Sequence, residues 1–244
     1  MKQAILFIVV FHVTFFCFSQ SRIAFIKGGL KTVNAYNSTK KSVLVKLDSE
    51  TYFSCDSLSG NWYKFDMPFY FDGYIHKDSI QFFQNLSKLK QKQKINKALN
   101  YFYSICKSDK KIKDSVYGTL RQSYYTKTFY PILEQFFNYY KETKDTSTIL
   151  NLLNAVKCNP DGEFATTFAF LIGSCYDFDK KLFARQIIQT KNRKNRKQFT
   201  NILLGSAQIF YRDRCIRKEM DASKIETLLD NENSTILKLT KASR

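Results

Sequence analysis

The side chains that most often carry enzyme chemistry are few in this 244-residue chain. His12 and His76 are the only histidines, and His12 lies within an apolar N-terminal run. A zinc site built from several histidines, or a catalytic triad that needs a second one, is therefore excluded. A Cys–His nucleophile pair would have to use His76, and no histidine follows it in the chain. The chain also has no glycine-rich phosphate loop and no CxxC motif, so we expect no catalytic residue, no metal site and no cofactor.

Paired carboxylates, which carry glycoside hydrolysis, would have to come from the fifteen acids after residue 88. None of the glutamates lies in a motif linked to that chemistry, and most stand beside lysine or at the ends of predicted helices. Such positions are typical of a solvated surface. The glutamates are Glu134, Glu142, Glu163, Glu219, Glu226 and Glu232. A cell-wall hydrolase with a carboxylate site that no motif marks is kept as an alternative.

Basic residues are the second feature that could do chemistry, by attracting anions. The chain has 39 Lys and Arg against 21 Asp and Glu, a net charge of +18. Most of the excess lies from residue 88 onward, where thirty basic residues face fifteen acids. Five cations fall within seven residues of one run: Lys191, Arg193, Lys194, Arg196 and Lys197. We expect this run either to bind an anionic partner or to be a solvated loop.

The first nineteen residues have the pattern of a signal peptide. Lys2 precedes the apolar run AILFIVVFHVTFF, and the small residues Cys17 and Ser19 end it. We predict cleavage after Ser19 and a bacterial protein that is exported, periplasmic or secreted, and not transmembrane after signal removal. An N-terminal anchor helix and, more weakly, a lipoprotein at Cys17 are the alternatives. Export argues against nucleic acid as the partner of the basic run.

Residues 20–86 have the composition and turn spacing of short strands. The segments are RIAFI, KTVNAY, SVLVKL, TYFSC, NWYKF and GYIHKDSI, and they are rich in β-branched and aromatic residues. Turn pairs such as Gly28-Gly29 and Asp72-Gly73 separate them. Five or six strands in about sixty residues predict a small β-barrel.

This region resembles a bacterial SH3 (SH3b) domain. The resemblance rests on four pieces of sequence. They are the strand and loop Val33–Ser38, the alternating residues Leu47, Glu50, Phe53 and Cys55, the Gly60, Trp62 and Phe65 pattern, and the closing Gly73, Tyr74, Ile75 and Ile80. SH3-like domains bind through aromatic residues and loops on one face. The resemblance therefore implies Tyr36, Asn37, Trp62 and Tyr74 as binding residues, although Trp62 and Tyr74 could instead fill the core.

From Ser87 onward the apolar residues recur at helical spacing, as in Ile95, Leu99 and Phe102. Similar stripes continue through Leu229 and predict seven or eight short helices joined by brief turns. Asp114, Asp145 and Asp177 are candidate N-caps, Ser223 and Glu226 have capping-box spacing, and Pro160 suits a first helical position. The expected fold is α+β: a signal peptide (1–19), a small all-β SH3-like barrel (20–86), and a basic α-helical domain (88–244). The helical domain would be a bundle or a short array of helix pairs.

Five cysteines follow the predicted signal: Cys55, Cys106, Cys158, Cys175 and Cys215. Cys55 takes an inward apolar position of the predicted barrel, which favours a buried thiol. Export permits disulfides among the others. Cys175 and Cys215 fall near the C-terminal ends of helices two apart and are the one pair that we name. Five reduced, buried thiols are the alternative.

These features together predict an exported, non-catalytic envelope protein. Its SH3-like domain would bind a peptide or a cell-wall fragment, and its basic helices would dock another protein or an anionic surface. Besides the hydrolase, the alternative is an immunity or chaperone protein that masks an acidic partner.

Overall fold

The computed structural model describes residues 22–48, 51–67, 71–109, 130–157 and 162–241. The predicted signal peptide, 1–19, lies outside the described residues. Tertiary contacts divide the chain into two compact units that meet in sequence between Leu86 and Ser87. Tyr130 and Pro131 are grouped with the first unit. We call the first the sheet unit and the second the helical unit.

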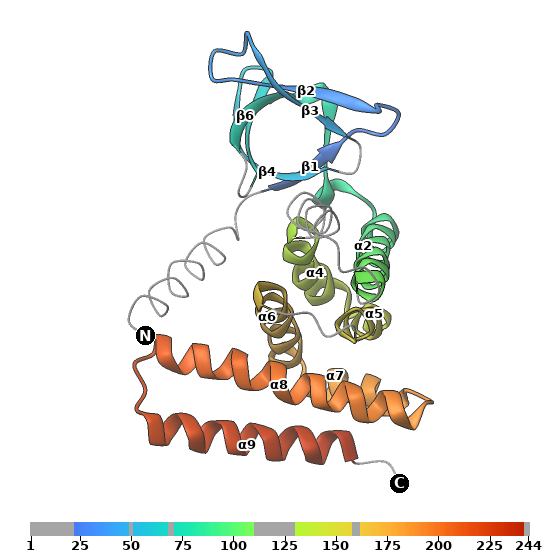
Figure 1. Cartoon of the computed structure of the whole chain (residues 1–244), viewed down its shortest axis with the longest axis vertical. Coiled ribbons are helices and arrows are strands. Elements are labelled where there is room, and N and C mark those ends of the chain that lie inside the picture. The colour runs from blue at the N-terminus through green and yellow to red at the C-terminus, as the bar shows by residue number, and fades with distance from the viewer. Residues whose placement is uncertain (1–21, 49–50, 68–70, 110–129, 158–161, 242–244) are drawn as a thin grey trace. The chain divides into compact units, whose positions relative to one another are not determined.

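Within the described residues, the sheet unit is one antiparallel sheet of seven strands in the order β3-β2-β6-β5-β4-β1-β7 (Figure 1). The strands are β1 (Arg22–Ile26), β2 (Thr32–Tyr36), β3 (Val43–Asp48), β4 (Tyr52–Ser59), β5 (Trp62–Met67), β6 (Phe71–His76) and β7 (Ile80–Phe82). Two short 3-10 helices, η2 (Lys77–Ser79) and η3 (Phe83–Asn85), follow β6 and β7. The closing segment GYIHKDSI is thus two strands joined by a 3-10 turn.

One face of the sheet supplies the core of this unit. Phe53, Cys55, Phe65 and Ile75 are each at most 1% exposed and belong to a single buried cluster. Figure 1 shows the sheet strongly curled, which lets residues from distant strands meet on the inner side. Of the inward positions predicted from the alternation, Leu47, Phe53 and Cys55 are therefore confirmed as core, and Glu50 lies outside the described residues.

A close approach inside the curl requires a glycine. Phe65 lies directly opposite Gly73 in the β5–β6 pairing. A Cβ at Gly73 would come within 2.8 Å of the Phe65 ring and 3.0 Å of the Tyr36 carbonyl oxygen. The phenyl ring thus covers the glycine, and no larger residue fits without displacing it.

The closed barrel expected from the sequence is not what the strand pairing gives. β3 and β7 are the two ends of the strand order, and within the described residues they do not pair with each other. β7 has only three residues and pairs with β1 alone among the described strands. The curled sheet is therefore not closed by hydrogen bonds.

The helical unit contains seven described helices. They are α2 (Lys88–Asp109), α4 (Tyr130–Thr143), α5 (Thr146–Val156), α6 (Gly162–Phe178), α7 (Lys180–Gln189), α8 (Arg193–Arg217) and α9 (Ala222–Lys241). Three of them have twenty or more residues, so the expectation of short helices throughout was wrong. The α+β layout, a sheet followed by helices, is confirmed.

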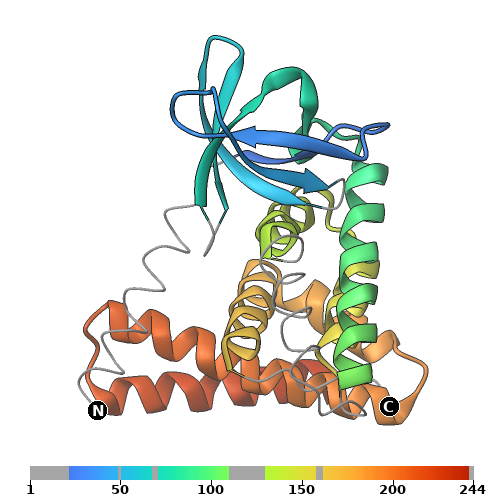
Figure 2. The same ribbon diagram turned by 45° about the horizontal axis from the view of Figure 1, so that its top comes forward.

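The expected apolar stripes form the interior of this unit. Ile95, Leu99 and Phe102 on α2 are each at most 3% exposed, and Phe102 lies 5.1 Å from Phe168 of α6 between ring centroids. Figures 1 and 2 show α8 and α9 as a long antiparallel pair, with α6 lying across α8. Within the described residues, no helix combines the length and the apolar character needed to cross a bilayer.

The N-caps agree with the sequence at one site and differ at two. Asp145 accepts from the Ser147 amide and caps α5, as predicted. Asp177 does not cap α7, because α6 continues to Phe178 and Asp179 takes that role. Asp114 and Pro160 lie outside the described residues.

The capping box predicted at Ser223 and Glu226 is also wrong. α9 begins at Ala222, so Asp221 caps it by accepting from the Lys224 amide at 2.9 Å. The Glu226 carboxylate instead pairs with Arg212 of α8 at 2.9 Å.

Candidate functional site

Strand register gathers four aromatic side chains on the outer face of the sheet. Trp62 lies directly opposite His76, and Tyr36 lies directly opposite Tyr74. Directly opposite residues project to the same side of a sheet, and residues two apart on one strand share that side. Tyr74 and His76 are two apart, so all four share the side opposite Phe65 and Ile75. We call Tyr36, Trp62, Tyr74 and His76 the aromatic face.

The rings of the aromatic face touch edge to face. The Tyr36 and Trp62 centroids are 5.1 Å apart at 80°, and those of Trp62 and His76 are 5.3 Å apart at 85°. All four side chains are half-buried and none belongs to the buried core of the sheet unit. Such edge-to-face contacts hold the rings in fixed orientations while leaving part of each exposed. Trp62 and Tyr74 are thus on the surface and do not fill the core.

Cations border the aromatic face. The Lys40 ammonium lies 5.0 Å above the Tyr74 ring, within the range of a cation–π contact. Lys64, opposite Tyr74 in the sheet, pairs with Asp72 at 3.7 Å. The site therefore offers flat apolar surface with positive charge beside it, which suits a ligand that has both apolar and anionic groups.

Asn37 shapes the loop beside the aromatic face. Its side-chain oxygen accepts from the Thr39 hydroxyl at 2.8 Å and from the amides of Lys41 and Ser42 at 3.4 Å. These bonds hold the turn between β2 and β3, where Lys40 has the left-handed φ of 60°. Asn37 thus positions Lys40, and its direct contact with a ligand stays a prediction.

A bulge extends the aromatic face toward the sheet edge. Ala35 pairs with Val45 and Tyr36 with Val43, so Leu44 is an extra residue on β3. Val43 and Leu44 are 49% and 48% exposed. Val43, opposite Tyr36, continues the apolar surface along the outer face.

His76 belongs to this site, although the sequence analysis considered it only as the partner that a nucleophilic cysteine would need. The available signal was its spacing of two from Tyr74 in an alternating strand. Its Nδ1 accepts from the Asp78 amide at 3.4 Å and lies 3.5 Å from the Asp78 carboxylate. The ring therefore adds a polar group as well as an apolar edge to the aromatic face.

The basic run predicted as an anion site lies at the start of α8. Asn192 caps the helix by accepting from the Asn195 amide, and α8 begins at Arg193. Lys191, Arg193, Lys194 and Lys197 are exposed. Arg196 is half-buried and its guanidinium reaches the Ile188 carbonyl oxygen at 3.5 Å. The run is thus largely helical and is not a loop.

The predicted Cys175–Cys215 disulfide is not formed, since both are free, buried thiols. Helix periodicity explains this. Asp177 of α6 contacts α8, because its carboxylate accepts from the Tyr211 hydroxyl at 2.7 Å and pairs with Arg214 at 2.8 Å. Cys175 precedes Asp177 by two residues, about 200° around the helix, and so lies away from α8.

The remaining cysteines separate into described and undescribed side chains. Cys55 is a free, buried thiol, as predicted. Its pKa lies well above the usual value, and burial is the largest cause of this shift. The Cys106 side chain and Cys158 lie outside the described parts of the chain.

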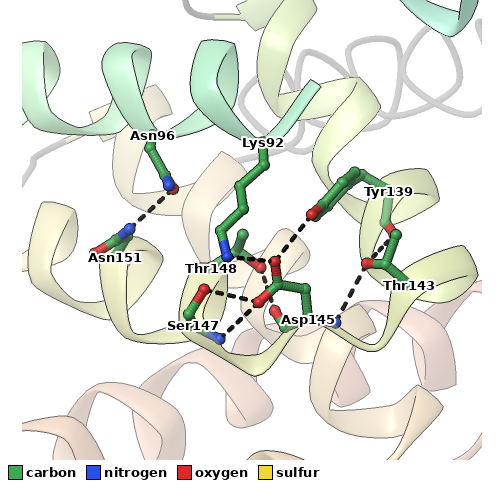
Figure 3. A network of polar contacts seen from close by, with 8 residues as sticks. All are labelled: Lys92, Asn96, Tyr139, Thr143, Asp145, Ser147, Thr148 and Asn151. Atoms are coloured by element: carbon green, nitrogen blue, oxygen red, sulfur yellow. Dashed lines mark hydrogen bonds and ion pairs between the residues drawn. The ribbon is translucent and has the colours of Figure 1, made fainter. Parts of the chain in front are cut away.

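A polar network in the helical unit is structural in character (Figure 3). Asp145 receives hydrogen bonds from the Tyr139 hydroxyl at 2.9 Å and the Ser147 hydroxyl at 2.7 Å, and Lys92 of α2 pairs with it at 2.8 Å. Partial burial alone would raise its pKa, but these donors hold the pKa below its ordinary value. Every group points at a neighbour on α2, α4 or α5, so the network ties three helices together.

Glu134 is the one described carboxyl group whose pKa is raised into the neutral range. Burial on α4 raises it to about 8, and no charged neighbour among the described groups contributes. Glycoside hydrolysis would need a second carboxylate close to that of Glu134. The described residues also contain no cluster of His, Cys, Asp and Glu that could hold a metal ion. The aromatic face and the basic run are therefore the candidate binding surfaces among the described residues.

Comparisons with known proteins were made for sequence families, for curated proteins and for solved structures. The chain matches no family model, no curated protein and no solved structure.

Proposed function

We propose that this is an exported, non-catalytic envelope protein that binds a peptide or a cell-wall fragment on the aromatic face of its sheet unit. The gathering of Tyr36, Trp62, Tyr74 and His76 on the outer side of the sheet carries this proposal. Half-exposed aromatic rings gain apolar burial when a ligand covers them, and they lose little side-chain entropy because their neighbours already hold them.

The proposal includes an SH3-like fold for the sheet unit. Two features of the SH3b-like sequence pattern support it. Gly60 takes a left-handed φ of 62° in the tight turn before Trp62, where the pattern has its glycine. Ile75 and Ile80, the apolar residues of the closing segment, are 0% and 7% exposed.

The ligand class follows from what surrounds the rings. Lys40 favours carboxylates, and the imidazole of His76 can form a hydrogen bond to a polar group of the ligand. The stem peptides of cell-wall fragments carry both groups together with short apolar side chains. Exposed Val43 gives such side chains a surface beside Tyr36.

The single tryptophan makes the test direct, because Trp62 is the only one in the chain and lies in the site. The mature protein would be titrated with soluble muropeptides and, separately, with their isolated stem peptides, with tryptophan emission as the readout. We expect saturable changes for at least the stem peptides. Tyr36→Ala and Tyr74→Ala, which keep the reporter, should each weaken binding about tenfold.

Tyr101→Ala is the matched control, since Tyr101 is an exposed aromatic residue on α2 of the helical unit. It should bind like the wild type. Unchanged affinity in both aromatic-face variants would overturn the proposal. Cleavage of the muropeptides by the wild type would favour the hydrolase instead.

A further inference from the structure

One end of the helical unit carries basic residues without acidic residues among them. Residues 180–211 contain eight Lys and Arg and no Asp or Glu. Five of the eight form the run at the start of α8, and four of those five are exposed. An acid-free stretch of this length leaves the run without a local neutralising partner.

The end of α9 adds to the same region. Arg212 of α8 pairs with Glu226 of α9 at 2.9 Å, and the two helices run antiparallel (Figure 2). Fifteen residues back from Arg212 is Lys197, and fifteen residues on from Glu226 is Lys241. Because both helices rise by about 1.5 Å per residue, Lys197 and Lys241 lie level with each other.

We call this region the basic end. It consists of Lys191, Arg193, Lys194, Arg196 and Lys197 with Lys238 and Lys241 of the last turn of α9. The chain after Glu232 has no acid. Among the described residues, none of the seven forms an ion pair with a carboxylate. Elsewhere in the unit cations are paired, as Arg214 with Asp177 and Lys180 with Glu232.

The arrangement has an electrostatic cost in the free protein. The N-terminus of α8 carries the positive end of its helix dipole, and its first turn has basic residues and no acid. Like charges at this spacing repel one another. An external anion that covers the basic end would relieve both effects.

We propose that the basic end docks the helical unit on a bilayer containing anionic phospholipids. Six of its seven side chains are exposed and long, which suits many exchangeable phosphates better than one fixed carboxylate. Leu237, directly before Lys238 on α9, is 36% exposed and offers an apolar contact at the same end. The inference does not rest on the aromatic face, which lies in the other unit.

The surface fits lipid better than nucleic acid. Single strands need exposed aromatic rings for stacking, but Phe199, the aromatic residue next to the run on α8, is only 2% exposed. The predicted export signal also takes the chain across a membrane with anionic head groups. Binding to DNA is kept as an outcome of the test.

The test is co-sedimentation of the mature protein with vesicles of phosphatidylcholine alone and with added phosphatidylglycerol. We expect binding only to the anionic vesicles, with loss at high salt because exposed charges act over about 10 Å at 0.1 M salt and about 3 Å at 1 M. Lys194→Glu, Lys197→Glu and Lys241→Glu combined should lower the partition coefficient at least about 100-fold. Arg196 is left in place because it contacts the Ile188 carbonyl.

A matched triple variant carries the same charge change in the sheet unit, at Lys27, Lys31 and Lys77, which are exposed. It should bind anionic vesicles nearly as the wild type does. The three Gln substitutions at 194, 197 and 241 should give an intermediate loss, with circular dichroism showing that the helices persist. Equal loss in both Glu variants, wild-type binding by the basic-end variant, or binding to duplex DNA but not to anionic vesicles would each overturn the proposal.

Discussion

The sheet unit and the helical unit use their aromatic and charged residues in opposite ways. Residues 20–87 carry eight basic and six acidic residues, and several aromatic rings of this unit stay half-exposed on one face. Residues 88–244 carry thirty basic and fifteen acidic residues, and large rings such as Phe136, Phe168 and Phe183 are fully buried. This difference is why we propose contact-based recognition for the sheet unit and salt-sensitive attraction for the helical unit.

The strongest way to test this division is to disrupt one core at a time. Phe65→Ala removes a fully buried ring that packs 5.2 Å from Phe53, and should cost about 3–5 kcal/mol in the sheet unit. We expect the Trp62 emission transition to shift to lower denaturant while the far-UV helical transition stays in place. Phe168→Ala in the helical unit should do the reverse. Joint shifts of both signals in both variants would show that the two units unfold as one.

A second test concerns the network around Asp145. Asp145→Ala removes the cap of α5 and the acceptor of Lys92 and Tyr139, so we expect a loss of about 2 kcal/mol. Asp145→Asn keeps a capping group but not the charge and should lose less. Thermal unfolding of the wild type and the two variants at neutral pH measures both losses of stability.

The same carboxylate predicts a pH dependence. Its folded pKa lies below the unfolded value of about 4, so its stabilising effect is present above that value. The effect is lost as the pH falls through the folded pKa. The gap between wild type and Asp145→Asn should therefore close in acid, and a constant gap down to pH 2 would contradict the assignment.

Glu134 should behave in the opposite direction. Its folded pKa of about 8 lies above its unfolded value, so the stability that its protonated form provides is present below about pH 4 and lost as the pH rises through 8. Glu134→Gln cannot ionise and should be more stable than the wild type above pH 8, by roughly 2–4 kcal/mol, because each unit of the raised pKa is worth about 1.4 kcal/mol. Unfolding at pH 5 and pH 9 checks this, and a variant that is equally destabilised at both values would contradict it.

The smallest expected effect sharpens the contrast in charge. Arg193→Glu puts an acid at the N-terminus of α8 in place of a cation, and should stabilise the helical unit by about 0.3–1 kcal/mol at low salt. The gain should fall at 1 M salt. Lys77→Glu in the sheet unit is the control and should change stability less. A destabilised Arg193→Glu would mean that this guanidinium has a structural role.

The sequence predicted the local structure well because periodicity and turn residues act over short distances. The change from alternating to helical spacing near Ser87 located the boundary between strands and helices. The inward positions Phe53 and Cys55 followed from alternation, and the Asp145 cap followed from its place before an apolar stripe. The predicted signal peptide rests on local pattern in the same way, outside the described residues.

Contacts between segments far apart in the chain decided the features that the sequence could not predict. Strand register, which depends on all neighbouring strands at once, brought Tyr36 beside Trp62 and added His76 to the same face. Helix length set the caps of α7 and α9, and the rotation between Cys175 and Asp177 turned one thiol away from α8. Lys241 lies level with the start of α8 only because two long helices pack antiparallel. Nothing within either segment specifies its neighbour.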